Sequence, residues 1–151
     1  MTGSLVVHRT DLVEDTGTAI SPEVDVGQVE GGLVMGQGLW TTEQVRHKPN
    51  MIMMVILMMI SQIRHHPETG SLLDNSSWHY KVPTHRDVPA DLRITFYNSG
   101  DNSRGVLGSK ATGEPSVLAG VGVLFAVRMA VKSARKDGGR EGWFKLGRLK
   151  L

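Results

Sequence analysis

Residues 110–115, with the sequence KATGEP, hold the side chain whose surroundings are most suggestive of chemistry. The carboxylate Glu114 directly follows Gly113, and a residue without a Cβ allows a ligand to come close to the main chain. Pro115 favours the first turn of a helix, so Glu114 is expected at a helix N-terminus. A carboxylate in that position also interacts favourably with the helix dipole, by about 0.3–1 kcal/mol. From the pattern alone, this purely structural explanation is preferred.

The histidines do not form a recognisable metal site. Three of them, His47, His65 and His66, flank an apolar segment, and His79 and His85 lie in predicted loops. None shows the i, i+4 helical spacing of a zinc-binding motif, so we expect exposed or hydrogen-bonded side chains and no metal ligand. The sequence contains no cysteine, which excludes disulfides, cysteine-based zinc sites and conventional iron–sulfur clusters.

The end of the chain is basic. Residues 132–150 are rich in Lys and Arg and include Trp143 and Phe144, a weak similarity to nucleic-acid-binding patches. A favourable helix C-terminus followed by a solvated basic tail, residues 138–151, is the preferred explanation. The formal net charge of +2 does not demand an acidic partner, and no nucleic-acid partner is expected.

Four segments are expected to position these side chains. Alternating apolar and β-branched residues predict strands over residues 5–13 and 91–97. Apolar residues at three- and four-residue steps predict helices over residues 22–44 and 115–138. The second helix is expected to bury one apolar stripe, made up of Val117, Leu118, Val121, Leu124, Phe125 and Met129. The predicted fold is α+β, with two main helices packed against short strands.

The first predicted helix contains an unusual number of glycines. They are Gly27, Gly31, Gly32, Gly36 and Gly38. Glycine inside a helix costs up to about 1 kcal/mol relative to alanine, so close approach of something to this helix is indicated. Tight packing against another element and close approach of a ligand explain the pattern about equally well.

An unbroken apolar run extends from Met51 to Ile60. A membrane-spanning helix needs about 20 apolar residues, and this run has about half that length. Lys48 and Arg64 lie close to its two ends, so no membrane association is expected. The N-terminus lacks the apolar core of a secretory signal, and a cytoplasmic location is therefore expected.

Three blocks carry a family resemblance. They are SPEVDVGQVEGGLVMGQGLWTTEQ (residues 21–44), PETGSLLDNSSWHYKVPTHRDVPADLRITFY (residues 67–97) and GSKATGEPSVLAGVGVLFAVRMAV (residues 108–131). In this order they resemble the C-terminal portion of the molybdopterin-binding region of aldehyde oxidases and xanthine dehydrogenases. The resemblance covers nearly the whole chain except residues 48–66 and the last dozen residues.

This resemblance implies a function. Members of the family are molybdenum-dependent oxidoreductases that hydroxylate aldehydes or N-heterocycles with oxygen taken from water. The glutamate of the GEP motif, which corresponds to Glu114, removes the proton from the attacking hydroxide as general base. Gln28 matches a glutamine that contacts the pterin part of molybdopterin, and Gly113 would let the main chain approach that cofactor. The metal is held by the dithiolene sulfurs of the cofactor, so no side-chain ligand is required.

The resemblance also implies what lies outside this segment. Full-length members bind 2Fe–2S clusters and FAD through regions that precede it, and they are homodimers. The sequence is therefore expected to be a truncated piece of a larger molybdopterin-binding domain, inactive in isolation. The alternative is a non-catalytic small protein that associates with a membrane or a partner.

Some positions depart from the family. Ser116 replaces a second proline after GEP and is expected to weaken the loop–helix junction, Gln37 stands where leucine is common, and Thr16 stands where cysteine often follows Glu-Asp. Residues 48–66 interrupt the match. The segment is rich in residue types that A/T-rich codons encode (Met, Ile, Asn and Lys), which suggests a retained intron or gene-model error. A genuine insert or a surface helix are the alternatives. The predicted organisation is a partial molybdopterin-binding domain over 1–47 and 67–137, separated by this hydrophobic insert.

Overall fold

The computed structural model describes residues 5–43, 66–78, 80, 82–100 and 102–146. Two compact units are present: residues 1–41 together with 83–151, and residues 42–82. The proposed insert lies outside the described residues except for His66. The two units are considered separately below.

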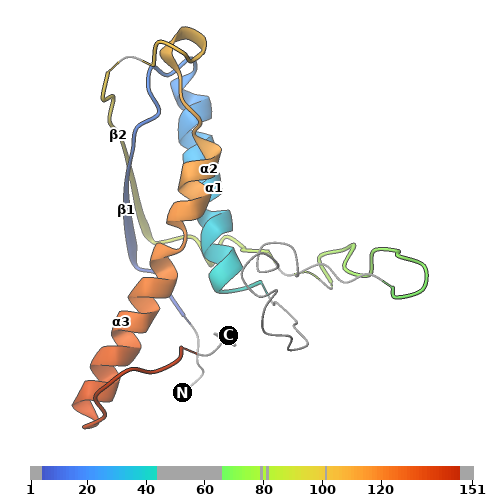
Figure 1. Cartoon of the computed structure of the whole chain (residues 1–151), viewed down its shortest axis with the longest axis vertical. Helices are drawn as coiled ribbons and strands as arrows, with labels where there is room; N and C mark the ends of the chain where they lie inside the picture. Colours follow the sequence, from blue (N-terminus) through green and yellow to red (C-terminus); the bar gives the residue numbers. More distant parts are fainter. Residues whose placement is uncertain (1–4, 44–65, 79, 81, 101, 147–151) are drawn as a thin grey trace. The chain divides into compact units, whose positions relative to one another are not determined.

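The first unit contains a two-stranded parallel sheet (Figure 1). Strand β1 (Arg9–Glu14) pairs with β2 (Asp91–Phe96) in a register that places Arg9 opposite Asp91 and Glu14 opposite Phe96. The predicted strand over residues 5–13 begins later than expected. Val7 and His8 accept backbone hydrogen bonds from Ala90 and Asp91, but regular pairing starts only at Arg9.

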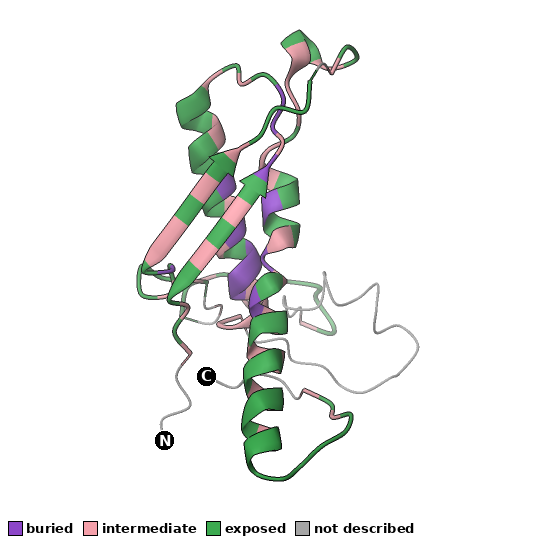
Figure 2. Cartoon of the chain, turned by 90° about the vertical axis from the view of Figure 1, so that its left-hand side faces the viewer, coloured by how far each residue is buried: buried purple, intermediate pink, exposed green. Residues whose placement is uncertain are grey.

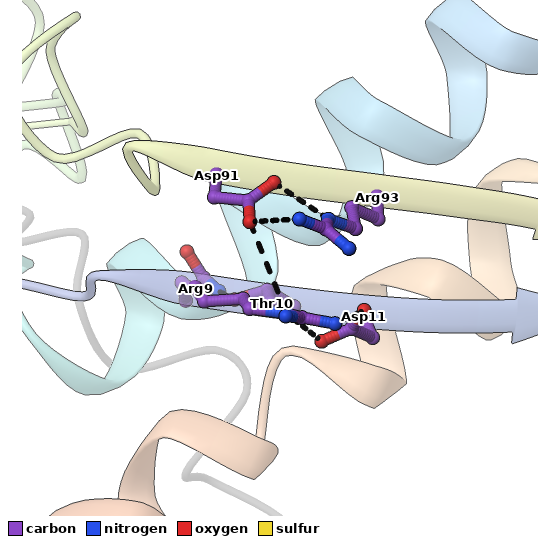
Figure 3. Close-up of polar contacts among 6 residues, drawn as sticks. Arg9, Thr10, Asp11, Asp91 and Arg93 are labelled. Atoms are coloured by element: carbon purple, nitrogen blue, oxygen red, sulfur yellow. Dashed lines mark hydrogen bonds and ion pairs between the residues drawn. The ribbon is translucent and has the colours of Figure 1, made fainter.

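The outer face of the sheet carries a set of ion pairs (Figure 3). Arg9 binds Asp11 through two hydrogen bonds of 2.7 Å, and Arg93 binds Asp91 at 2.8 Å. The register places opposite charges across the strands, since Arg9 faces Asp91 and Asp11 faces Arg93. These side chains are half exposed, so this face of the sheet is a solvated surface.

Helix α1 (Pro22–Trp40) supplies most of the small core (Figure 2). Pro22 occupies the first helical turn, where its missing N–H is not needed. Val29 and Leu33 are 0% and 2% exposed and are the largest buried apolar side chains among the described residues. They follow the predicted stripe, because residues four apart lie on one face of a helix.

Two of the helical glycines lie at a crossing with helix α2 (Gly113–Ala119). A Cβ on Gly32 would lie 2.7 Å from the carbonyl oxygen of Gly113, and one on Gly36 would lie 2.9 Å from the carbonyl carbon of Val117. Gly27 and Gly31, by contrast, have no atom within 4 Å of a built Cβ. Packing therefore explains Gly32 and Gly36, and the other two glycines face open space.

The second predicted helix is divided into α2 and α3 (Gly122–Asp137). The break lies at Gly120, where a Cβ would come within 2.6 Å of the main-chain nitrogen of Gln37. Only glycine fits this contact, and glycine is also a poor helix former. Helix α2 starts at Gly113, two residues before Pro115. The proline is tolerated there because the N–H groups of the first turn have no helical partner.

The predicted buried stripe on this helix pair was wrong. Leu118, Phe125 and Met129 are more than half exposed, and the buried positions are Ser116, Gly120 and Val123. The cause is that α2 meets α1 through its small residues, and none of the described elements covers the large apolar side chains. The stretch Gly113–Asp137 is long and apolar enough to cross a membrane. Core helices of soluble proteins have the same length and composition, so this property is weak evidence for a membrane span.

The described part of the basic tail, residues 138–146, contacts α3 through Phe144 and is not wholly solvated. The guanidinium groups of Arg128 and Arg135 lie 4.7 and 4.8 Å from the ring centre of Phe144. Arg128 also donates a hydrogen bond of 3.2 Å to the Phe144 carbonyl oxygen. Cation–π contacts of this kind attach the tail, whereas the neighbouring Trp143 is 81% exposed.

The described residues of the second unit are rich in turns. Gly70 donates a backbone hydrogen bond of 2.9 Å to the carbonyl oxygen of His66, which closes a tight turn. The Tyr80 hydroxyl donates a hydrogen bond to the Glu43 carboxylate. Burial raises the pKa of the Glu43 carboxyl, and burial together with the neighbouring carboxylate raises the pKa of the Tyr80 hydroxyl.

Candidate functional site

The structure brings the three predicted site residues to one place in the first unit. Gln28 lies on the first half of α1, and Gly113 and Glu114 begin α2. A Cβ built on Gly113 would lie 3.5 Å from the side-chain oxygen of Gln28, which is ordinary van der Waals contact. The helix crossing at Gly32 holds the two segments together at this point.

The two polar side chains of this site are exposed and unpaired among the described residues. Neither the Gln28 amide nor the Glu114 carboxylate makes a hydrogen bond or ion pair with another described side chain. Gly27 and Gly31 flank Gln28 at one and three residues along α1, and both lack a neighbour within 4 Å. The helix surface around Gln28 is thus free of protruding side chains at these positions.

Ser116, which stands where the family usually has a proline, makes a hydrogen bond at the start of α2. Its side chain is fully buried, and its hydroxyl donates a hydrogen bond of 2.8 Å to the Gly113 carbonyl oxygen. The same oxygen atom of Ser116 lies against Gly32. The serine therefore adds a hydrogen bond at the loop–helix junction, and the expected weakening of this junction relative to a proline stays a prediction.

The segment that leads to Glu114 is attached to the turn after β1. Lys110 donates a backbone hydrogen bond of 3.0 Å to Thr16, and Thr18 donates one of 3.0 Å to Gly108. The turn requires glycine, because Gly17 has a φ of +64° and its missing Cβ leaves room for the Gly108 carbonyl group. Thr16, where the family often has cysteine, is 2% exposed.

Sequence reasoning missed an ion pair beside this segment. Lys110 Nζ lies 2.6 Å from Asp15 Oδ2, and both side chains are about 30% exposed. The lysine, a hydrogen bond from Ser99 and the backbone N–H of Gly17 together hold the pKa of the Asp15 carboxyl well below its usual range. Both residues lie in turn-rich segments far apart in the chain, so no local pattern could have revealed the pair.

Two buried polar groups near α1 lack partners among the described residues. Both carboxylate oxygens of Glu14 are unpaired, and burial raises the pKa of this carboxyl. Gln37, the position where the family often has leucine, donates a hydrogen bond of 3.3 Å to Thr10, but its side-chain oxygen is unpaired. Unsatisfied buried groups of this kind reduce stability.

An apolar groove of about 450 Å³ lies elsewhere in the first unit. It is lined by residues 5–10, by Leu33 and Gln37 of α1, and by one side of the α2–α3 segment, namely Ala119, Gly122, Val123, Ala126, Val127 and Ala130. None of Gln28, Gly113 and Glu114 contributes to it. Within the described part of the chain, no group of three or more His, Asp or Glu side chains could hold a metal ion.

Comparison with known proteins decides the family. The model of the molybdopterin cofactor-binding domain matches residues 1–89, more than half of the chain. The chain belongs to the molybdopterin cofactor-binding domain family. The match identifies molybdopterin as the cofactor of the family. Together with the relatives given next, it confirms the resemblance to aldehyde oxidases and xanthine dehydrogenases.

Relatives of this molybdopterin-binding chain are large enzymes. It is 33% identical over 97% of its length to a xanthine dehydrogenase/oxidase of Gallus gallus and 36% identical over 97% to an aldehyde oxidase 1 of Cavia porcellus. It spans only 9% and 10% of these two proteins.

A solved structure supports the fold. The crystal structure of quinoline 2-oxidoreductase from Pseudomonas putida 86 matches with a TM-score of 0.52 and 27% identity, over 77% of this chain and 12% of that one. The predicted α+β fold, part of a larger molybdopterin-binding domain, is thereby confirmed.

Proposed function

We propose that this chain forms part of a molybdenum hydroxylase, in which Gln28 and Gly113 help to hold molybdopterin and Glu114 acts as general base. The observation that carries the proposal is the approach of the Gln28 side-chain oxygen to within 3.5 Å of the place that a Cβ on Gly113 would occupy, next in sequence to the unpaired carboxylate of Glu114. A general base needs a free carboxylate within hydrogen-bonding reach of the proton that it removes. Glu114 is free in this sense among the described residues.

The residues present fit the cofactor. Gln28 offers an amide that can both donate and accept hydrogen bonds, and no described side chain occupies it. Gly27 and Gly31 leave the adjacent helix surface open, which a bulky ring system requires. These glycines therefore support the ligand explanation, whereas Gly32 and Gly36 serve packing.

The proposed reaction inserts oxygen from water into a C–H bond of an aldehyde or N-heterocycle. For an aldehyde, RCHO and H₂O give RCOOH, two protons and two electrons. The cofactor, when bound, supplies the redox chemistry by accepting those two electrons. Glu114 accepts one of the protons, from the water-derived oxygen that becomes bonded to the substrate carbon. Gln28 and Gly113 act by binding and orientation.

The isolated chain is proposed to be inactive. Glu114 is exposed, and acid–base chemistry of this kind depends on a site that excludes bulk water. The chain also spans about a tenth of the relatives it matches. We further propose that the full-length protein carries 2Fe–2S clusters and FAD in regions outside this segment, is a homodimer and is cytoplasmic.

A non-catalytic role has one observation in its favour. Leu118, Phe125 and Met129 form an exposed apolar face on α2 and α3, which a membrane or a protein partner could cover. Fractionation of cells into membrane and soluble fractions tests whether the non-catalytic role involves a membrane. A chain found wholly in the soluble fraction would contradict membrane association.

Steady-state kinetics of Glu114→Gln in the full-length enzyme tests the proposed function. General acid–base catalysis contributes about 10²–10⁴-fold, so turnover per bound molybdenum should fall by this factor. Molybdenum content should not change, because Gln keeps the size of Glu and the side chain is exposed. Glu141→Gln, an exposed position in the tail, is the matched control. Unchanged turnover in Glu114→Gln would remove this residue from the mechanism.

A further inference from the structure

The ion pair between Asp15 and Lys110 is one part of a larger connection. Ser99 donates a hydrogen bond to Asp15 and accepts one of 3.1 Å from Lys110 Nζ. The backbone N–H of Gly17 donates a hydrogen bond of 2.9 Å to the other Asp15 oxygen. Asp15 thus accepts hydrogen bonds from three different segments: the turn after β1, the loop after β2 and the segment before α2.

Backbone contacts surround the same point. The bonds from Lys110 to Thr16 and from Thr18 to Gly108 lie on either side of an antiparallel bridge between Gly17 and Ser109. The chain is therefore fixed at residues 108–110, only a few residues before Gly113 and Glu114. The segment 111–113 lies between this anchor and the helix crossing at Gly32, so contacts hold both of its ends.

We infer that the ion pair of Asp15 and Lys110 positions Glu114, by fixing the segment that carries Gly113 beside Gln28. The inference rests on the proposed function, since it assigns positioning residues to the same site. Asp15 and Lys110 do not touch a reacting atom in this account. They act through the main chain of residues 110–113.

The chemistry of the pair fits a positioning role better than a role in stability alone. Exposed ion pairs contribute little to stability, typically 0–1 kcal/mol. This pair is more enclosed than the half-exposed Arg9–Asp11 pair on the sheet, and it has additional hydrogen bonds to Ser99 and Gly17. Charge-assisted hydrogen bonds with fixed partners define geometry as well as energy.

Substitutions in the full-length holoenzyme separate positioning from folding. Asp15→Asn keeps the acceptor for Gly17 but removes the charge, Lys110→Met removes the ammonium group, and Lys110→Arg keeps the positive charge. A misplacement of about 1 Å can cost 10²-fold in rate, so the first two variants should lower kcat by roughly 10–100-fold. KM and molybdenum content should stay within about twofold, and Lys110→Arg should recover most of the rate.

The double variant Asp15→Asn/Lys110→Met provides a further criterion. If the two residues act as one unit, its kcat should be no lower than that of either single variant. Arg9→Met and Asp11→Asn, which break an exposed ion pair on strand β1, are the matched controls and should leave kcat unchanged.

Amide hydrogen exchange gives a measurement that does not depend on activity. Exchange at Lys110 and Thr18 should accelerate in Asp15→Asn and Lys110→Met but not in Lys110→Arg, because the two N–H groups close the backbone contacts beside the pair. These exchange rates also test the positioning role in a variant that is poorly loaded with cofactor.

Unchanged kcat and unchanged exchange in Asp15→Asn would overturn the inference. A fall in kcat that merely follows a loss of molybdenum, with unchanged exchange at Lys110 and Thr18, would also overturn it, in favour of a role in folding. Failure of the proposed function has a different signature. In that case Glu114→Gln would retain turnover, whatever the exchange rates of Lys110 and Thr18 show.

Discussion

The side-chain oxygen of Gln28 lies within van der Waals distance of the position that a Cβ on Gly113 would occupy, at 3.5 Å. The two residues come from different helices and from distant parts of the chain. The close packing of Gly32 and Gly36 on α2 holds the start of α2, which carries Gly113 and Glu114, beside α1. The proposed cofactor contacts depend on this relationship.

A methyl group at Gly113 should interfere with ligand binding but not with folding. Gly113→Ala places its Cβ in ordinary contact with Gln28 and in a helical backbone, so the protein should fold. The methyl group would occupy space beside the proposed pterin contact, and molybdenum content of the full-length enzyme should fall. Gly122→Ala, where a Cβ meets nothing within 4 Å, is the control. Full molybdenum content in Gly113→Ala would argue against a ligand at this position.

A methyl group at Gly120 should destabilise the helix crossing. Its Cβ would lie 2.6 Å from main-chain atoms of Gly36 and Gln37, and overpacking of this kind typically costs 1–3 kcal/mol. Thermal unfolding should show a lower Tm for Gly120→Ala. Gly122→Ala should instead raise stability by up to about 1 kcal/mol, because alanine is the better helix former and the site is open. Equal Tm values for the two variants would show that the crossing is not tight.

Two carboxylates should give pH dependences of opposite sign. The Asp15 pKa is lowered in the folded state, chiefly by Lys110, so its contribution to stability is present above its ordinary pKa of 3.8 and is lost as the pH falls. Unfolding measured at pH 7 and near pH 3 should therefore show Asp15→Asn less stable than the parent protein at pH 7, with a smaller difference at roughly pH 3. A difference that is independent of pH would exclude the ion pair as its cause.

For Glu14 the change of stability with pH has the opposite sign. Burial raises the pKa of this carboxyl, so the folded state binds the proton more tightly than the unfolded state does. Stability should decrease as the pH rises above the ordinary value of 4.5, and Glu14→Gln should remove this decrease. Unfolding of parent and variant between about pH 4 and pH 7 measures the effect. A difference in stability between parent and variant that does not change over this range would contradict the burial of an unpaired carboxyl.

The attachment of the tail depends on one aromatic ring. Phe144→Ala removes the cation–π contacts with Arg128 and Arg135, each worth about 0.5–1 kcal/mol at an exposed site. Limited proteolysis at Lys145 should become faster in this variant. Trp143→Ala, which removes an exposed neighbouring ring, should have no such effect. Equal cleavage rates in the two variants would mean that the ring does not hold the tail.

Local sequence patterns predicted the elements but not the contacts between them. The periodicity of Val29 and Leu33 gave α1, because side chains four residues apart necessarily share a helix face. The break at Gly120 depends on the main chain of Gly36, and a one-dimensional pattern contains no information on such an approach. For the same reason, neither the parallel pairing of β1 with β2 nor the Asp15–Lys110 pair was predicted.

The candidate site was predictable only through the family resemblance. The surroundings of Glu114 alone favoured a helix-dipole explanation, and the glycines of α1 left packing and ligand binding equally open. The structure separates them, since Gly32 and Gly36 pack against α2 while Gly27 and Gly31 are open. The catalytic and binding roles of Glu114, Gln28 and Gly113 stay predictions.

The central claim, that Glu114 is the general base, is tested most directly by the reductive half-reaction. Full-length enzyme with Glu114→Gln, mixed anaerobically with substrate, should be reduced about 10²–10⁴-fold more slowly per bound molybdenum than the parent enzyme. The Glu141→Gln control should be reduced at the parental rate. A Glu114→Gln enzyme that is fully loaded and reduced within twofold of the parental rate would contradict the account.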